Sequence, residues 1–68
     1  MSEWLKMIDG KHVQFTEREI PDGFEYNAHF NPGGIVEWRS KDRLTPEEAE
    51  KAILKKRRAL KEGKQFGR

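Results

Sequence analysis

The stretch TPEEAEKAILKKRRALKEG, residues 45–63, carries the strongest secondary-structure signal in this chain of 68 residues. Thr45 can cap a helix through its hydroxyl, Pro46 suits the first helical position, and Glu48 completes a capping box. Gly63 is placed to end the helix in a left-handed conformation. The stretch therefore predicts one helix near the carboxyl end of the chain.

One side of this helix is apolar enough to face a core. At roughly 100° per residue, its alanines and larger apolar residues fall within one arc. Lys56 lies inside the arc, and we expect its alkyl stem to run past the edge of the core. Leu54 lies outside the arc and has no explanation at this level. The residues expected to face the core are Ala49, Ala52, Ile53, Ala59 and Leu60.

The same helix changes charge along its length. Its first turn is acidic, which suits the positive end of the helix dipole. The eighteen residues after Glu50 carry eight bases against one acid, a net charge of +7. One interpretation is a solvated face that helical pairs such as Glu47–Lys51 and Arg58–Glu62 partly neutralise. The other is a surface that contacts phosphates.

Length and composition limit the core. The chain predicts one small domain over residues 1–63, followed by a basic tail over 64–68. Only 34% of residues are hydrophobic and 38% are charged, which leaves no room for a buried substrate cleft of ordinary size. The absence of cysteine excludes disulfides and zinc–thiolate sites. The charged start and the short apolar runs predict a cytoplasmic protein with neither a signal peptide nor a membrane segment.

Two apolar runs flank Asp9-Gly10 near the amino end. Asp-Gly between such runs is a strong signal for a two-residue hairpin turn, because both turn positions need a positive φ. That hairpin sets Trp4 opposite Phe15. The alternative for residues 4–8 is a short helical turn packed over the sheet.

The following strand ends at Pro21-Asp22-Gly23, a turn in which glycine takes the position that needs a positive φ. Ile20 falls out of phase with Phe15 in the alternating pattern of this strand. A bulge near Glu17–Glu19 would bring both apolar side chains inward.

The clearest strand covers residues 24–30, in which aromatic residues and Ala28 alternate with polar residues. A loop over residues 32–34 then keeps one apolar face, because it pairs Phe30 with Val36 and Ala28 with Trp38. On the other face, the same register predicts three polar pairs: Glu25 with Lys41, Asn27 with Arg39, and His29 with Glu37.

These patterns predict an α+β fold, an antiparallel meander of three or four strands followed by one carboxyl-terminal helix packed on one face. The edge strands, residues 12–20 or the amino-terminal strand, allow a dimer by sheet extension, so we expect a monomer or an edge-strand dimer. No motif predicts catalysis: Pro32-Gly33-Gly34 lacks the Lys-Ser/Thr of a phosphate-binding loop, and no carboxylate lies in an apolar run. We therefore expect no enzyme activity, no cofactor and no metal.

Two segments share a further pattern: FEYNAHFNPGG, residues 24–34, and LTPEEAEKA, residues 44–52. They resemble the AP2-like arm-type DNA-binding domain of phage and transposon integrases, which has an aromatic strand, an Asp/Asn-Pro-x-Gly turn and a Phe-x-Thr-x-x-Glu-Ala helix start. The resemblance covers residues 13–55, with Leu44 at a position that is usually aromatic. It implies a sheet that enters the major groove of DNA, braced from behind by the helix. The sheet residues that would then contact DNA are Asn27, Arg39 and Lys41.

The leading functional prediction is a small nucleic-acid-binding accessory protein of phage or mobile-element type that contacts the phosphate backbone of DNA, or of RNA. The alternative is a protein-interaction module such as a phage-encoded inhibitor of a host protein. A net charge of −3 over residues 1–34 (three bases, six acids) and +5 over residues 35–68 (eleven bases, six acids) would suit a partner of mixed potential. The predicted nucleic-acid-binding residues are Arg39, Lys41, Lys55, Arg57, Arg58, Lys61 and Asn27.

Overall fold

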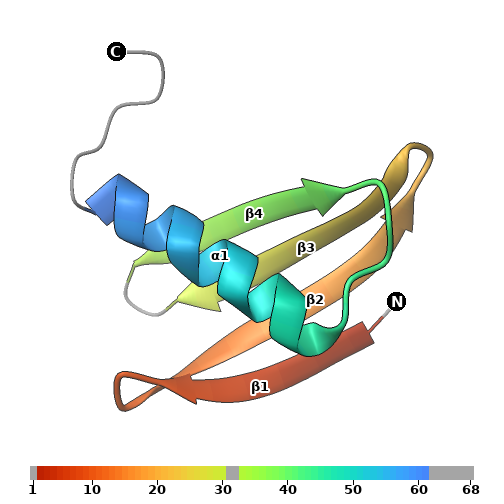
Figure 1. Ribbon diagram of the computed structural model, residues 1–68. Coiled ribbons are helices and arrows are strands. Elements are labelled where there is room, and N and C mark those ends of the chain that lie inside the picture. The colour runs from red at the N-terminus through yellow and green to blue at the C-terminus, as the bar shows by residue number, and fades with distance from the viewer. Residues whose placement is uncertain (1, 31–32, 62–68) are drawn as a thin grey trace.

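A computed structural model describes residues 2–30 and 33–61. They form a four-stranded antiparallel sheet in the order β1-β2-β3-β4, with one helix lying across a face of the sheet (Figure 1). The predicted α+β meander with a carboxyl-terminal helix is confirmed. The predicted helix end at Gly63 and the basic tail at 64–68 lie outside the described residues. The elements are β1 (Ser2–Ile8), β2 (Lys11–Ile20), β3 (Gly23–Phe30), β4 (Gly34–Ser40) and α1 (Pro46–Lys61).

The first hairpin has the predicted register, with Trp4 opposite Phe15, so residues 4–8 belong to a strand. Asp9 and Gly10 have φ values of 53° and 78°, as the two central positions of this tight turn require. The rings of Trp4 and Phe15 stack with their centroids 5.4 Å apart. This stack lies on the side of the sheet that faces the helix, and it joins the edge strand β1 to the core.

Strand β2 pairs with β3 without the predicted bulge. Ile20 pairs with Gly23 and therefore lies on the opposite face of the sheet from Phe15. The inner face at this end of β2 is occupied by Glu17, which is only 7% exposed. Hydrogen bonds from Tyr26 and Arg43 satisfy this carboxylate, which makes its burial tolerable. The bulge prediction was wrong because it assumed that an apolar side chain must fill that position.

The second hairpin, between β3 and β4, departs from the predicted register by two residues. Phe30 lies opposite Gly34 and Ala28 opposite Val36. A Cβ atom on Gly33 would lie 3.2 Å from the Cβ of Phe30 and 3.6 Å from Nη2 of Arg57. The tight approach is to Phe30 and the φ of Gly33 is 136°, so the hairpin itself favours glycine here, whereas the distance to the Arg57 guanidinium is an ordinary contact.

A shift of two residues leaves every side chain on its predicted face, because side chains alternate with a period of two. The cross-strand partners nevertheless change. Glu25 lies opposite Arg39 rather than Lys41, Asn27 lies opposite Glu37 rather than Arg39, and His29 lies opposite Ile35 rather than Glu37. On the inner face, Trp38 lies opposite Tyr26 rather than Ala28.

The core lies between α1 and the sheet. The helix contributes Ala49 and Ile53, and Leu54 packs against the same cluster. Leu60, which was expected to face the core, is 52% exposed. Leu60 lies in line with the buried Ala49 and Ile53 at 100° per residue, so its exposure follows from its position in the last turn of α1 and not from a rotation of the helix. The buried sheet residues of the core are Val13, Phe15, Tyr26, Ala28, Phe30 and Val36.

Candidate nucleic-acid interface

The start of α1 is held by a reciprocal cap. The amide of Glu48 donates to Oγ1 of Thr45 at 3.1 Å, and the amide of Thr45 donates to Oε1 of Glu48 at 2.9 Å. The predicted capping box is confirmed, and it satisfies two backbone groups that a helix end leaves without partners. Glu48, one of the acidic residues of the first turn, therefore helps to begin the helix by capping it.

A buried tyrosine fixes the segment that leads into the helix. The Tyr26 hydroxyl accepts a hydrogen bond from the amide of Leu44 at 2.7 Å and donates to Oε2 of Glu17 at 2.9 Å. Arg43 approaches the same carboxylate, with Nη2 3.2 Å from Oε1. Burial alone would raise the pKa of Glu17, but the hydrogen bonds from Arg43 and Tyr26 and the charge of Arg43 lower it below its usual value.

Strand β1 holds the second turn of the helix through Glu50. The indole Nε1 of Trp4 donates to Oε2 of Glu50 at 2.7 Å, and Nζ of Lys6 lies 3.1 Å from Oε1 of the same residue. Glu50 is 7% exposed, so both carboxylate oxygens have partners where water is largely excluded. The helix is thus attached to the sheet by polar contacts as well as by its core residues.

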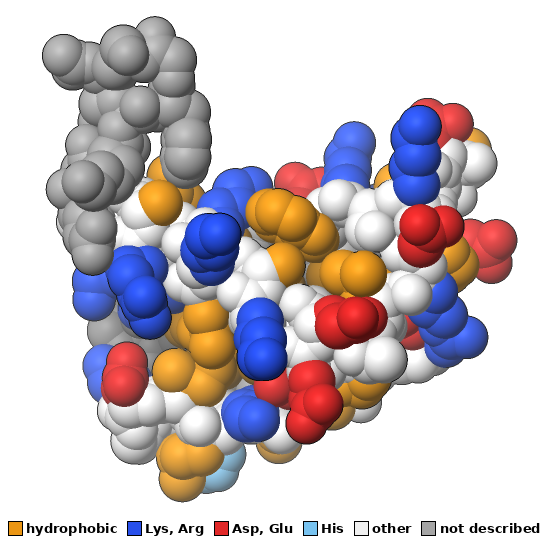
Figure 2. Space-filling view, in the orientation of Figure 1, with side chains coloured by type: hydrophobic (Ala, Val, Ile, Leu, Met, Phe, Trp, Pro, Cys, Tyr) orange, Lys and Arg blue, Asp and Glu red, His pale blue; other side chains and the backbone are white. Residues whose placement is uncertain are grey.

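The exposed side of α1 is cationic. Residues 51, 55, 58 and 61 follow one another at steps of four, three and three, so their side chains form a stripe along the helix. At a rise of 1.5 Å per residue, the stripe is about 15 Å long. Figure 2 shows Lys and Arg side chains along this face of the molecule, with hydrophobic surface on either side of the helix. We call this stripe the cationic ridge, formed by Lys51, Lys55, Arg58 and Lys61.

No cation of the ridge forms a salt bridge with a carboxylate among residues 2–30 and 33–61. All four residues are exposed. The pair expected between Glu47 and Lys51 is absent from the described contacts, and the pair expected between Arg58 and Glu62 involves a residue outside them. The ridge therefore presents positive charge to solvent.

An open groove lies beside the ridge, between the carboxyl-terminal half of α1 and the β1–β2 turn. It has a volume of about 500 Å³. A smaller hollow of about 200 Å³, which includes Lys11, adjoins it. Arg57 lies over the Phe30 ring, with its Cζ 4.1 Å from the ring centroid, so this guanidinium is positioned by a cation–π contact. We call this the turn groove, lined by Ile8, Asp9, Leu54, Arg57, Arg58 and Lys61.

A second groove lies on the opposite side of the ridge, between α1 and β4. It has a volume of about 660 Å³, and its lining combines apolar side chains with three lysines. Nζ of Lys56 donates to the backbone carbonyl of Glu37 at 2.7 Å, which holds this side chain across the edge strand. We call this the Trp38 groove, lined by Trp38, Lys51, Ala52, Lys55, Lys56 and Ala59.

The predicted site residues are not all in one place. Lys55, Arg58 and Lys61 lie together on the ridge, and Arg57 lies beside them in the turn groove. Asn27 and Arg39 belong to the outer face of the sheet, away from the helix. Lys41 follows the end of β4 next to Gly23, at the opposite end of the molecule from Lys61 (Figure 1).

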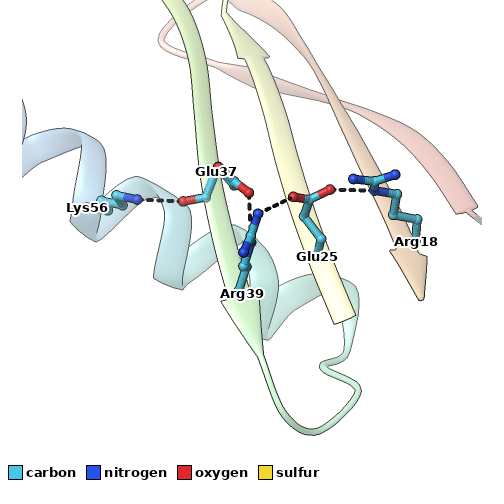
Figure 3. Close-up of polar contacts among 5 residues, drawn as sticks. All are labelled: Arg18, Glu25, Glu37, Arg39 and Lys56. Atoms are coloured by element: carbon cyan, nitrogen blue, oxygen red, sulfur yellow. Dashed lines mark hydrogen bonds and ion pairs between the residues drawn. The ribbon is translucent and has the colours of Figure 1, made fainter. Parts of the chain in front are cut away.

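Arg39 is engaged by two carboxylates. Its Nε donates to Oε2 of Glu37 at 2.9 Å and its Nη2 to Oε2 of Glu25 at 3.4 Å, while Arg18 contacts the other oxygen of Glu25 (Figure 3). The hydrogen bond from Arg18 and the positive charges of Arg18 and Arg39 lower the pKa of Glu25 to about 2. The Glu37 carboxylate, followed by Glu25, raises the pKa of Arg39. The outer face at this point is an internally neutralised row of charges.

Three residues of this region were not among the predicted site residues. Lys51 is one helical step before Lys55, and that spacing is a signal from which it could have been found. Lys11 and Trp38 carry no such signal, because their positions beside the helix depend on how α1 crosses the sheet. No cluster of three or more side chains suited to a metal ion occurs in the part of the chain that the structure describes.

Comparisons with protein-family models, with curated proteins and with solved structures found no match to this chain. Within residues 2–30 and 33–61, no helix is both long enough and apolar enough to cross a bilayer. The charge distribution and the shape of the surface are therefore the basis for assigning a function.

Proposed function

We propose that this protein binds nucleic acid, with DNA the leading candidate, by placing the cationic ridge of α1 against the phosphate backbone. One observation carries the proposal: four exposed cations lie in a row on an anchored helix, and none forms a salt bridge to a carboxylate in residues 2–30 and 33–61. A row of cations about 15 Å long matches a polyanion better than it matches a single small ligand. Arg57 in the turn groove and Lys11 in the adjoining hollow extend the positive surface beyond the ridge.

A salt titration tests this proposal. If the four ridge cations neutralise about four phosphates, the log–log slope of affinity against salt should be about −3 to −4 on duplex DNA. Affinity for a labelled random duplex of about 20 base pairs should then fall about 100-fold between roughly 50 and 200 mM salt. No detectable binding at the lower salt concentration would refute duplex binding by the ridge.

The resemblance to integrase arm-binding domains supports a different docking face, the outer side of the sheet. In that arrangement Asn27, Arg39 and Lys41 would contact DNA, and Arg39 would first have to leave Glu25 and Glu37. Replacing Arg39 by alanine separates the two arrangements. The helix-based arrangement predicts unchanged affinity, whereas the sheet-based one predicts a loss of about tenfold.

A second candidate function, a protein-interaction module, is favoured by a separate observation. Leu5, Met7 and Ile35 all lie on the outer face of the sheet and are 66%, 57% and 63% exposed. Leu5 and Met7 are neighbours on the edge strand β1, whereas Ile35 lies on the opposite edge strand β4, and neighbouring exposed apolar side chains such as Leu5 and Met7 favour a protein contact surface. Under this function, Leu5→Ser with Met7→Ser should abolish capture of a partner from nuclease-treated lysate. The double change Lys55→Glu with Arg58→Glu should leave that capture intact.

A further inference from the structure

The Trp38 groove differs from the rest of the helix surface because small side chains line it. Ala52 and Ala59 are half-buried there and leave space beside the indole of Trp38. Nζ of Lys56 is occupied by the carbonyl of Glu37, so its stem forms a fixed part of the wall. The groove is thus an open, largely apolar slot bounded by one aromatic ring.

The slot is directly beside the cationic ridge. Lys51 and Lys55 line the groove and also belong to the ridge, so an apolar contact and a charged contact are available to one ligand at the same time. An occupant of this site needs a flat apolar group that can lie against Trp38. It also needs negative charge on either side of that group, within reach of the lysines.

An unpaired nucleotide has this combination of properties. Its base has an apolar face suited to aromatic stacking, and phosphates flank it along the strand. In a duplex the base faces are covered by neighbouring base pairs, so the slot would stay empty and only the ridge would make contact. An acidic peptide carries charge beside apolar groups, but it lacks the planar face that matches an indole.

We propose that the Trp38 groove accepts an unpaired nucleobase while Lys51 and Lys55 contact the flanking phosphates, so that the protein prefers single-stranded nucleic acid to duplex. This inference rests on the proposed nucleic-acid binding and names its substrate class. The turn groove, on the other side of the helix, contributes charge to both substrates and does not discriminate between them.

The test compares three probes of the same length: a thymidine oligonucleotide, an abasic oligonucleotide and a duplex. Wild-type protein should bind the thymidine strand about tenfold tighter than the abasic strand, because stacking of a base on an aromatic side chain contributes about this much. The change Ala59→Leu fills the slot without altering charge or the buried core. With this change, the affinities for the thymidine and abasic strands should become about equal, and the duplex affinity should stay unchanged.

Gln14→Leu is the matched control, since it adds the same side chain on the exposed outer face and should retain the preference. Trp38→Leu should lose the preference as Ala59→Leu does. In a Trp4→Phe background, where Trp38 is the one remaining indole, the thymidine strand should quench its fluorescence and the abasic strand should not.

Different results would overturn base insertion and nucleic-acid binding. Equal affinity for the thymidine and abasic strands, with duplex binding intact, would overturn base insertion and leave nucleic-acid binding standing. Binding of a polyglutamate peptide that Ala59→Leu abolishes, without any base-dependent preference, would overturn base insertion in favour of an acidic polypeptide. Absence of binding to all three nucleic-acid probes at low salt would refute both proposals.

Discussion

The cations of this protein fall into two regions that differ in what surrounds them. Every salt bridge described involves a cation from the sheet or from the segment after it: Lys6, Arg18, Arg39 and Arg43. The cations of the ridge on α1 form none with the carboxylates of residues 2–30 and 33–61. Paired cations hold elements together, whereas unpaired cations are available to a ligand. A count of charges along the sequence does not separate these two roles.

The largest effect is expected from reversing charge on the ridge. Lys55→Glu with Arg58→Glu should weaken duplex DNA binding about 100-fold at low salt, roughly tenfold for each reversed charge. The salt dependence should also become shallower by about one slope unit per lost contact. Fluorescence anisotropy at several salt concentrations measures both quantities.

The matched control for that experiment is Lys41→Glu with His12→Glu and His29→Glu, which lowers the net charge by the same four units at exposed positions and leaves the ridge and both grooves intact. A loss of affinity in the control as large as in the ridge variant would show that net charge, rather than the ridge, governs binding. Stability of the ridge variant should stay within about 0.5 kcal/mol of wild type, as is usual for exposed positions.

The next largest effect is a loss of stability in the sheet and the segment after it, where the cations form salt bridges. Tyr26→Phe removes the hydroxyl that joins Leu44 to Glu17 and leaves two buried partners with fewer hydrogen bonds. We expect the free energy of unfolding to fall by about 2 kcal/mol. Urea denaturation followed by circular dichroism measures the change. DNA affinity of the folded protein should be unchanged, and a large loss of affinity would contradict the division between the two regions.

The salt-bridged carboxylates of the sheet should also make the stability of the protein depend on pH, and we expect an effect of intermediate size. The pKa of Glu25 is about 2 in the folded protein, below the ordinary value of 4.5. A carboxylate with a lowered pKa stabilises the fold fully above its unfolded pKa, and this contribution is lost as pH falls from about 4.5 toward 2. Thermal unfolding should show this decline in wild type and a flatter profile in Glu25→Gln. Identical profiles for the two proteins would refute the assignment.

The smallest effect is a change in stability, and its sign differs between the cationic ridge and the salt-bridged cations. Lys55 lies one helical step from Lys51 and from Arg58, and like charges at this spacing repel by about 0.2–0.5 kcal/mol per pair. Lys55→Gln should therefore stabilise the protein slightly, while Arg43→Gln should destabilise it because Glu17 loses its cation. Both shifts can be measured as changes in the urea midpoint. A destabilised Lys55→Gln would indicate a partner for this lysine.

Local features of the chain allowed much of the fold to be predicted. Asp9-Gly10 predicted its hairpin and register, because a two-residue turn determines which residues face each other. Thr45 and Glu48 predicted the start of the helix, because the cap involves residues only three apart. The face of each β3 and β4 residue was also predicted correctly, since alternation depends only on the strand itself.

The wrong predictions concern features that depend on contacts between residues far apart in the sequence. Two registers of the β3–β4 hairpin that differ by two residues place the same side chains on the same faces, so alternation could not distinguish them. The cation–π contact of Phe30 with Arg57 is a tertiary contact that forms in the observed register. The helix was predicted with Leu60 inward because a hydrophobic arc gives the direction of a side chain around the helix axis, but not how far the sheet extends beneath the last turn.

The amino-acid sequence by itself determined the strand over residues 24–30, the Asp9-Gly10 turn, the helix start and the concentration of positive charge after Glu50. These depend on backbone preferences and on spacings of a few residues. Only the tertiary structure decided which charges are paired, because the partners are far apart in the chain: Trp4 and Glu50 are separated by 46 positions, and Arg43 and Glu17 by 26. Their contacts form only when the helix crosses the sheet, and the same crossing leaves the ridge cations facing solvent.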